Sequence, residues 1–377
     1  MRVEKGKTLI AKGCVRIEGD AEVIGSRLKY FECDKFVPIE CFGDVEAEVR
    51  GEYFIVDGFT IPESWKKLAK KDWETIFLYG GVDSGKSTLA TYLANKVGGA
   101  YVLDLDIGQA DIAHSGAMGY GFVKDVAALS QVEMINGFFV GSITPQGREL
   151  KCLRGVARLW KELKKLEGKK IIDTTGWIRG KRAKEYKMAK IEITEPDLIV
   201  SFEGKQFEDY EVYEVEKGPV LKRGKIERIK ARCESYIKFL RNSKIMEFEK
   251  KNIKLKPDLL NGKDITQFIA SLIEDVAFAK LGDGFLSICL KKRAEIDLGI
   301  IRELKDLYEV DDVFIFSEEE LRNVIVGLYK GKKYLGMGLL KSINEKILIV
   351  SAFSDFDTVE IGEIRFEDGK EFFIRRY

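Results

Sequence analysis

The segment from Gly80 to Ser87 has the residue types and the spacing of a phosphate-binding loop. Its sequence, GGVDSGKS, matches the pattern G-x-x-x-x-G-K-[ST] without a mismatch, through Gly80, Gly85, Lys86 and Ser87. Backbone N–H groups of such a loop surround phosphate oxygens, and the helix that begins there points its positive end at them. The motif predicts that the chain binds a nucleoside triphosphate. The residues predicted to contact it are Gly80, Gly81, Val82, Asp83, Ser84, Gly85, Lys86, Ser87 and Thr88.

Two carboxylates follow the next apolar run, in the segment LDLDIGQAD (103–111). Asp104 and Asp106 are two residues apart and therefore share one face of an extended chain. A carboxylate at this edge can hold Mg²⁺, together with the Ser87 hydroxyl, or accept a proton from an attacking hydroxyl group. The alternative is an ordinary Asp that caps the turn after a strand. We predict the functional role, and we assign it to Asp106 because it lies nearer the loop.

Two glycine-containing loops after later strands could line the same site. GSITPQGRE (141–149) carries Thr144 and Arg148, and DTTGWIRG (173–180) carries Thr175 and Trp177. Loops at the carboxyl ends of strands surround the ligand in open α/β sheets, and a tryptophan in such a loop can stack on a base. An ordinary turn before a helix remains the alternative for the first loop, and a core tryptophan for the second.

Basic residues concentrate in two later segments, RGKRAKEYKMAK (179–190) and KRGKIERIKAR (222–232). A solvated helix face is the usual interpretation of such a run. Because both runs lie in the region that carries the triphosphate motif, the cations could also act on a migrating phosphoryl group or on a nucleic acid backbone.

The elements that must position these residues follow a strand–helix–strand rhythm from about residue 75. Apolar strands are expected at 75–79, 100–106, 137–144, 169–176 and 196–204, with helices at 87–97 and 150–166. Continuous apolar strands that alternate with helices predict an α/β fold, with a parallel sheet covered by helices. Before this region, short strands broken by glycine predict a small antiparallel β domain.

Three domains are expected from these changes in pattern. They are an N-terminal β domain (1–61), a P-loop domain that begins with a helix at 62–71 (62–252), and a mixed, mostly β C-terminal domain (253–377). In the last of these, DITQFIASLIEDVAFAKLG (264–282) is expected to be helical throughout.

Composition narrows the classes of function. Lys and Arg number 63 against 62 Asp and Glu, so a net charge of +1 gives no global attraction for a polyanion. Six scattered cysteines without a C-x-x-C pair predict buried free thiols rather than a metal site or a disulfide framework. A single histidine, His114, excludes a multi-histidine metal site and a His-dependent triad. No signal peptide or bilayer-length apolar run is visible, and we expect a cytoplasmic protein without a membrane partner. Abundant Lys, Glu and Ile fit a heat-adapted source.

Together these features resemble the polynucleotide 5′-hydroxyl kinases. This family includes the RNA kinase associated with the pre-mRNA cleavage factor, the ribosomal-RNA-processing kinase and archaeal relatives. The resemblance covers about residues 75–250. It rests on the phosphate-binding loop, on LDIGQ as a form of the family's D-x-G-Q segment, and on GSITP, TTGW and the arginine-rich segment that follows. It implies transfer of phosphate from ATP, or another NTP, to the 5′-hydroxyl end of RNA or DNA, with Mg²⁺ as cofactor and RNA-processing proteins as partners.

The resemblance also implies roles for individual residues. Lys86, Ser87 and Thr88 would bind the triphosphate and Mg²⁺, and Asp106 would be the general base. The residues implied to hold the acceptor are Gln109, Thr144, Arg148, Thr175 and Trp177, and those implied to stabilise the transferring phosphoryl group are Arg223 and Arg228, with Arg232 as a further candidate in the same segment.

The sequence departs from the family pattern at two places. Ala110 stands where many members have Gly, and Thr175 stands where many have Cys in the T-C-G-W clasp. Three rival functions share a phosphate-binding loop. A regulatory GTPase would need an N-K-x-D motif, and NKVG (95–98) lacks the Asp; a transport ATPase would need an L-S-G-G-Q signature. A non-catalytic, ATP-binding scaffold of an RNA-processing complex is the third. The presence of Lys86, of Asp106 and of the arginines in the later arginine-rich segment favours the kinase over it.

Overall fold

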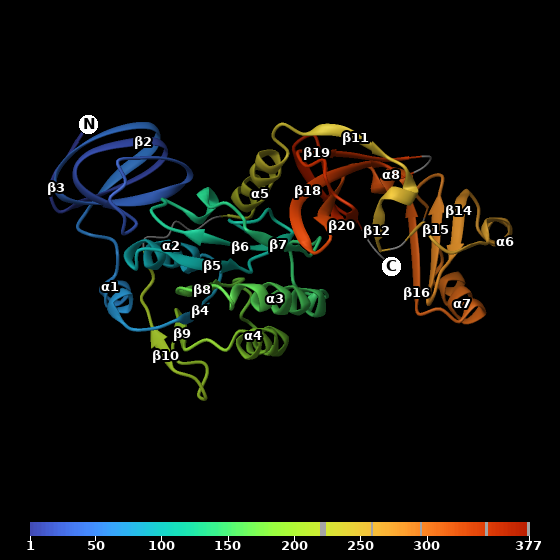
Figure 1. Cartoon of the computed structure of the whole chain (residues 1–377), viewed down its shortest axis with the longest axis horizontal. Helices are drawn as coiled ribbons and strands as arrows, with labels where there is room; N and C mark the ends of the chain where they lie inside the picture. Colours follow the sequence, from blue (N-terminus) through green and yellow to red (C-terminus); the bar gives the residue numbers. More distant parts are fainter. Residues whose placement is uncertain (219–223, 258, 295, 344–345, 375–377) are drawn as a thin grey trace. The chain divides into compact units, whose positions relative to one another are not determined.

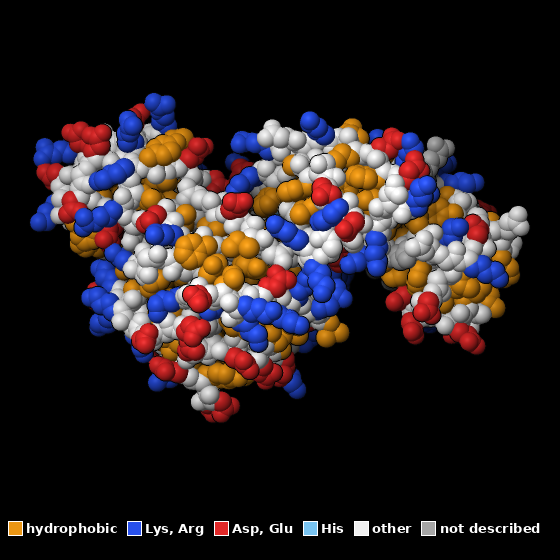
Figure 2. Space-filling view, viewed as in Figure 1, with side chains coloured by type: hydrophobic (Ala, Val, Ile, Leu, Met, Phe, Trp, Pro, Cys, Tyr) orange, Lys and Arg blue, Asp and Glu red, His pale blue; other side chains and the backbone are white. Residues whose placement is uncertain are grey.

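The computed structural model describes residues 1–218, 224–257, 259–294, 296–343 and 346–374. The chain divides into two compact units, Met1–Arg228 and Ile229–Tyr377, and each is described by itself. Arg223, one of the two predicted phosphoryl-binding arginines, lies outside the described residues. On the face drawn in Figure 2, basic and acidic side chains are interspersed over both units, as expected from the near-zero net charge.

The first unit begins with a small antiparallel β structure, as predicted. Its strands are β1 (Arg2–Val3), β2 (Lys7–Val23) and β3 (Tyr30–Asp57). β3 curves around β2 and pairs with both of its edges, so that Leu9 lies opposite both Ile39 and Ile55 (Figure 1). Most apolar residues of β2 are buried, consecutively at the start of the strand and alternately further along it. Helix α1 (Glu63–Lys70) follows at Pro62.

The central sheet has seven strands in the order β10-β9-β4-β8-β5-β6-β7. Their bounds are β4 (Thr75–Tyr79), β5 (Ala100–Asp104), β6 (Ala117–Val123), β7 (Asn136–Phe139), β8 (Lys170–Asp173), β9 (Leu198–Ser201) and β10 (Val212–Glu214). The run from β10 to β5 is parallel, as expected. β6 pairs antiparallel with both β5 and β7 and was not predicted, because Gly119 and Gly121 obscure its apolar pattern.

Helices cover both faces of this sheet (Figure 1). They are α2 (Lys86–Lys96), α3 (Glu149–Leu163) and α4 (Lys181–Thr194). This unit also contains a short 3₁₀ turn at Leu129–Gln131 and the first residues of α5 (Lys225–Phe239). Along β4, Ile76 and Leu78 belong to the core shared with α2, whereas Phe77 and Tyr79 belong to the core shared with α3. A strand buried on both faces explains why this segment is continuously apolar.

The second unit is mostly β, as expected. One sheet has the order β11-β19-β18-β17-β20-β12, with β21 beside β20, and the other has the order β13-β14-β15-β16. The strands are β11 (Lys244–Phe248), β12 (Lys254–Lys256), β13 (Lys263–Asp264), β14 (Val276–Leu281), β15 (Phe285–Leu290), β16 (Asp312–Ser317), β17 (Val324–Lys330), β18 (Lys333–Ser342), β19 (Ile347–Ser351), β20 (Thr358–Glu367) and β21 (Lys370–Phe373). The helical elements are α6 (Thr266–Leu272), α7 (Leu298–Tyr308), α8 (Glu318–Leu321) and a 3₁₀ turn at Lys250–Asn252.

The expectation of one helix over residues 264–282 is wrong. Helix α6 ends at Leu272, and the chain continues as β14 after Asp275, whose φ is 57°. A positive φ interrupts a helix. Residues Val276 to Leu281 pair with β15, and this non-local pairing overrides the local helical preference. Within the described residues, no helix combines the length and the apolar character that crossing a membrane requires.

Candidate active site

The phosphate-binding loop connects β4 to α2, as its motif requires. The backbone turns through Asp83 (φ 53°) and Gly85 (φ 101°) before the helix begins at Lys86. The Lys86 Nζ donates hydrogen bonds to the carbonyl oxygens of Gly80 (3.0 Å) and Gly81 (2.7 Å), so the ammonium group lies inside the loop. Burial lowers the pKa of Lys86, and the nearby carboxylates oppose this shift, Asp173 most strongly.

Ser87 is bonded to a carboxylate that the sequence analysis did not single out. Its Oγ donates to Asp173 Oδ2 at 2.6 Å. Asp173 is 1% exposed at the carboxyl end of β8, the strand hydrogen-bonded beside β4. Burial raises the pKa of Asp173 to about 6, although Lys86 and Ser87 act to lower it. The sequence did carry one signal for Asp173 as a site residue. It lies at the end of an apolar strand, immediately before the TTGW segment.

The two carboxylates that the sequence analysis singled out have different surroundings. Asp104 is buried, and its oxygens accept hydrogen bonds from the backbone N–H groups of Asp106 (3.0 Å), Asp111 (2.6 Å) and Ile112 (3.1 Å). Burial raises the pKa of Asp104 well above its ordinary value, and the Asp173 carboxylate adds to that shift. Asp104 therefore fixes the turn after β5.

Asp106 is half-buried in the turn that follows. Its Oδ1 accepts hydrogen bonds from the backbone N–H groups of Gly108 (3.0 Å) and Gln109 (3.1 Å). These bonds hold the carboxylate in one orientation at the carboxyl edge of the sheet. A positioned carboxylate of this kind can accept a proton from a hydroxyl group.

Gln109 and Arg228 connect this turn to the phosphate-binding loop. The Gln109 Nε2 donates to the Gly108 carbonyl at 2.8 Å and to the Arg228 carbonyl at 3.5 Å. The Arg228 Nη1 lies 3.3 Å from Asp83 Oδ2, and the Arg228 side chain is 31% exposed. The first turn of α5 thus brings a guanidinium group to the loop. Arg232, one turn later, instead forms a two-point ion pair with Glu371.

The TTGW segment lies directly against the phosphate-binding loop. A Cβ placed on Gly176 would lie 2.6 Å from both the N and the Cα of Val82, which leaves room for glycine alone. The neighbouring Thr174 anchors the segment to β4, because its Oγ1 donates a hydrogen bond to the carbonyl oxygen of Leu78 at 2.8 Å. Thr175 is buried, and Trp177 is half-buried with its ring centroid 5.7 Å from that of Tyr186.

Two lysines of the first basic run are buried below this segment rather than solvated. The Lys187 Nζ donates to Thr174 Oγ1 at 2.6 Å and also to Thr175. The Lys190 Nζ lies 4.2 Å from the centroid of the Tyr186 ring and has no hydrogen-bond partner among the described residues. Burial lowers the pKa of Lys187 well below its ordinary value and that of Lys190 to about 8. The expectation of a solvated helix face is therefore wrong for these two lysines, because α4 packs them against Thr174, Thr175 and Tyr186.

The loop after β7 approaches the Asp106 turn. The carbonyl oxygen of Ile143 would lie 2.9 Å from a Cβ placed on Gly108. Thr144 is exposed and hydrogen-bonds to Gln146, and the Arg148 Nη1 donates to the carbonyl of Gly147 at 2.8 Å. The structure thus brings the 141–148 loop beside the 106–109 turn.

The donor atoms present fit a magnesium–nucleotide complex. Mg²⁺ commonly binds through one or two carboxylates together with phosphate oxygens, and it prefers oxygen ligands. The Ser87 hydroxyl and the carboxylates of Asp106 and Asp173 belong to this chemical class.

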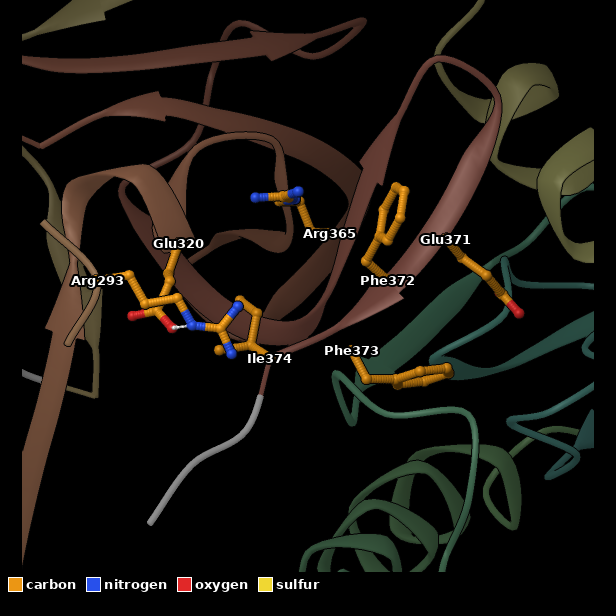
Figure 3. Close-up of a pocket in the computed structure, with 7 residues that line it drawn as sticks. All are labelled: Arg293, Glu320, Arg365, Glu371, Phe372, Phe373 and Ile374. Atoms are coloured by element: carbon orange, nitrogen blue, oxygen red, sulfur yellow. Dashed lines mark ion pairs between the residues drawn. The ribbon is translucent and has the colours of Figure 1, made fainter. Parts of the chain in front are cut away.

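A separate cavity of about 390 Å³ lies within the second unit (Figure 3). Arg293 and Glu320 form an ion pair of 3.3 Å at one part of its wall, and Arg365 lies over the Phe372 ring. None of the motif residues lines this cavity. Its lining residues are Arg293, Glu320, Arg365, Glu371, Phe372, Phe373 and Ile374.

Comparison with known proteins gives consistent results. The family model described as mRNA cleavage and polyadenylation factor CLP1 P-loop matches residues 80–249. The polyribonucleotide 5′-hydroxyl-kinase of Pyrococcus furiosus is 30% identical over 334 residues, which cover 81% of this chain and 91% of the relative. The corresponding protein of Pyrococcus abyssi is 30% identical over 341 residues, with 82% and 91% covered. That of Methanocaldococcus jannaschii is 28% identical over 326 residues, with 78% and 88% covered.

Solved structures show the same fold. A chain in the wild-type complex of Clp1p with Pcf11p (454–563) superposes with a TM-score of 0.66 and 12% sequence identity, and the match covers 97% of both chains. A chain in a second Clp1p–Pcf11p structure, which concerns their extended interface and ATP loss in a Gly135Arg mutant, gives a TM-score of 0.65 at 10% identity. At these identities the likeness establishes the fold alone.

Proposed function

This chain belongs to the family of the archaeal polyribonucleotide 5′-hydroxyl-kinases, and we propose that it transfers the γ-phosphate of ATP, or of another NTP, to the 5′-hydroxyl end of RNA. DNA ends are a second candidate acceptor. The observation that carries the proposal is the contact between Gly176 and Val82. It supports a two-substrate site, because the segment with the stacking tryptophan lies directly on the loop with the triphosphate motif.

The donor half of the proposed site is the loop from Gly80 to Thr88. Its N–H groups and Lys86 would bind the β- and γ-phosphates, and Ser87 would be a ligand of Mg²⁺. When bound, Mg²⁺ would neutralise charge on the β- and γ-oxygens. An ion pair with Asp83 holds Arg228 at this loop. Together with Arg223, Arg228 would stabilise the charge of the transferring phosphoryl group.

The acceptor half is the turn and the loops around Asp106. In the proposed reaction the 5′-oxygen forms a bond to the γ-phosphorus, the bond from that phosphorus to the β,γ-bridging oxygen breaks, and the 5′-hydroxyl proton passes to Asp106. Trp177 would stack on the terminal base. The residues proposed to position the acceptor end with it are Gln109, Thr144, Arg148 and Thr175.

The domain bounds, the localisation, the partners and the cofactors of this chain are also proposals. We divide the chain into an N-terminal β domain (1–61), a P-loop kinase domain (62–252) and a C-terminal domain (253–377). We also propose cytoplasmic localisation and an association with RNA-processing proteins, with ATP and Mg²⁺ as the working cofactors.

A transfer assay tests the proposed function. The protein is incubated with Mg²⁺, γ-labelled ATP and a short 5′-hydroxyl RNA, and then with DNA and with each other NTP. Label on the oligonucleotide is the expected result, and Lys86→Ala should abolish it. Label found only in free phosphate would indicate an NTPase. Tight ATP binding without any turnover would indicate the scaffold.

A further inference from the structure

Three carboxylates lie at the carboxyl ends of β5 and β8, and they differ in which oxygens are already bonded. Asp104 accepts backbone N–H groups on both of its oxygens. Asp106 accepts two backbone N–H groups on Oδ1. Both oxygens of Asp104 are therefore occupied by the backbone of the turn after β5. The bonds to Asp106 fix its side chain in the same turn.

The third carboxylate, Asp173, is arranged differently. Its Oδ2 accepts the Ser87 hydroxyl at 2.6 Å, and its Oδ1 is buried without a hydrogen-bond partner among the described residues. Leaving a buried carboxylate oxygen without a hydrogen-bond partner is unfavourable, because the oxygen has lost its contact with water. An unpaired oxygen next to the serine of a phosphate-binding loop indicates that a ligand supplies the missing partner.

The sheet order explains why Asp173 reaches Ser87. β8 is the direct neighbour of β4, with Phe77 opposite Ile172, whereas β5 is one strand further away. The strand that ends in Asp173 therefore emerges beside the phosphate-binding loop, and the strand that ends near Asp106 emerges beside β8. In P-loop enzymes the metal is held by the loop serine together with a carboxylate from a neighbouring strand.

We propose that Asp173 is the carboxylate that holds Mg²⁺ next to Ser87, directly or through a metal-bound water, and that Asp106 is thereby reserved for the acceptor hydroxyl. The proposal rests on the proposed magnesium–nucleotide site and refines it, because the sequence analysis assigned the metal to Ser87 and Asp106. It gives the two carboxylates separate tasks at the two ends of the reaction. Asp173 acts on the donor and Asp106 on the acceptor.

Metal binding tests this division without any turnover. The affinity of the protein for Mn²⁺ is measured by electron paramagnetic resonance in the presence of a non-hydrolysable ATP analogue, for wild type, Asp173→Asn and Asp106→Asn. Asp173→Asn should weaken Mn²⁺ binding by roughly 10- to 100-fold, in the range for loss of a metal-orienting group. Its affinity for the analogue in EDTA should stay within about twofold of wild type. Asp106→Asn should keep the wild-type Mn²⁺ affinity.

A matched control and a second measurement complete the test. Asp111→Asn removes a carboxylate of the same region that pairs with Lys35 instead, and it should leave Mn²⁺ affinity unchanged. If Asp173→Asn does not fold, a crystal structure of the wild type with Mg²⁺ and the analogue decides, since Asp173 should lie in the coordination sphere or one water away. Wild-type Mn²⁺ affinity in Asp173→Asn, loss of it in Asp106→Asn, or Asp106 at the metal in the crystal would overturn the proposal. Failure of the kinase itself would appear separately, as absent transfer by a wild type that binds Mn²⁺ normally.

Discussion

Gly176 and Val82, which belong to different loops of the central sheet, approach so closely that a Cβ on Gly176 would lie 2.6 Å from the Val82 Cα. Gly176 does not require a positive φ, so this contact alone restricts the position to glycine. The main chain of the TTGW segment therefore rests on the main chain of the phosphate-binding loop. The phosphate-binding loop therefore sets the position of the segment that we propose to bind the acceptor.

The first prediction concerns this contact. Gly176→Ala should push the TTGW segment away from the loop and lower kcat/KM for RNA phosphorylation by about 10²-fold, because a displacement near 1 Å is costly for a reaction between two positioned groups. Steady-state kinetics with both substrates check it. Gly43→Ala is the matched control, since its Cβ would meet only Asp20 at 3.4 Å. Equal activity of the two variants would contradict the role given to the contact.

The second prediction concerns Arg228 and its partner Asp83. Arg228→Ala should lower kcat on the order of 10³-fold while changing ATP affinity little, because a guanidinium group over the phosphoryl group acts mainly in the transition state. Asp83→Asn removes the charge that pairs with Arg228 but leaves the arginine in place, and it should cost far less. If both variants lose the same activity, Arg228 acts by holding the loop and not on the phosphate.

The third prediction concerns the buried Lys190. Its pKa of about 8 lies below the ordinary 10.5, chiefly through burial, with the Cys152 and Asp106 side chains acting in the opposite direction. Below pH 8 both folded and unfolded states carry the proton, and the full penalty of burying the charge applies. Between about pH 8 and 10.5 the folded state releases the proton while the unfolded state keeps it, so this penalty is relieved as the pH rises.

Lys190→Met should therefore raise the free energy of unfolding at pH 7, by up to about 3 kcal/mol from the 2.5-unit difference in pKa. The gain should shrink toward pH 10. Denaturant unfolding of both proteins across this range measures it, and Lys184→Met on the exposed side of the same helix is the control. A gain that did not depend on pH would show that packing, and not charge burial, is responsible.

Much of the architecture around the loop could be predicted from the sequence, because its signals are local. The motif from Gly80 to Ser87 lies between an apolar strand and a helix, and these form as β4 and α2. The bond between Ser87 and Asp173 joins residues 86 positions apart. The sequence could show Asp173 as a carboxylate at a strand end, but no local pattern specifies which strand end lies beside the loop. Its contact with Ser87 could be recognised only once the order β4-β8-β5 was known.

The basic run at 179–190 also shows that local sequence does not reveal which residues pack together in the fold. Lys184 is exposed, whereas Lys187 and Lys190 are fully buried, although all three lie on one helix. A charge run is usually solvated, and only the packing of α4 against the TTGW segment reverses that expectation here. Burial of a lysine is tolerated where acceptors or an aromatic face are provided, as at Thr174 and Tyr186.

The last prediction concerns Trp177. Its ring packs on Tyr186 on one side, with centroids 5.7 Å apart, and it remains half-exposed. Stacking of a base on an aromatic side chain contributes about 1–3 kcal/mol, so Trp177→Ala should raise KM for the 5′-hydroxyl RNA roughly 10-fold. ATP affinity should be unchanged, because we propose that Trp177 belongs to the acceptor half. Trp177→Phe keeps an aromatic face and should recover most of the loss. A fall in ATP affinity, or no recovery by phenylalanine, would mean that the ring supports the loop rather than the base.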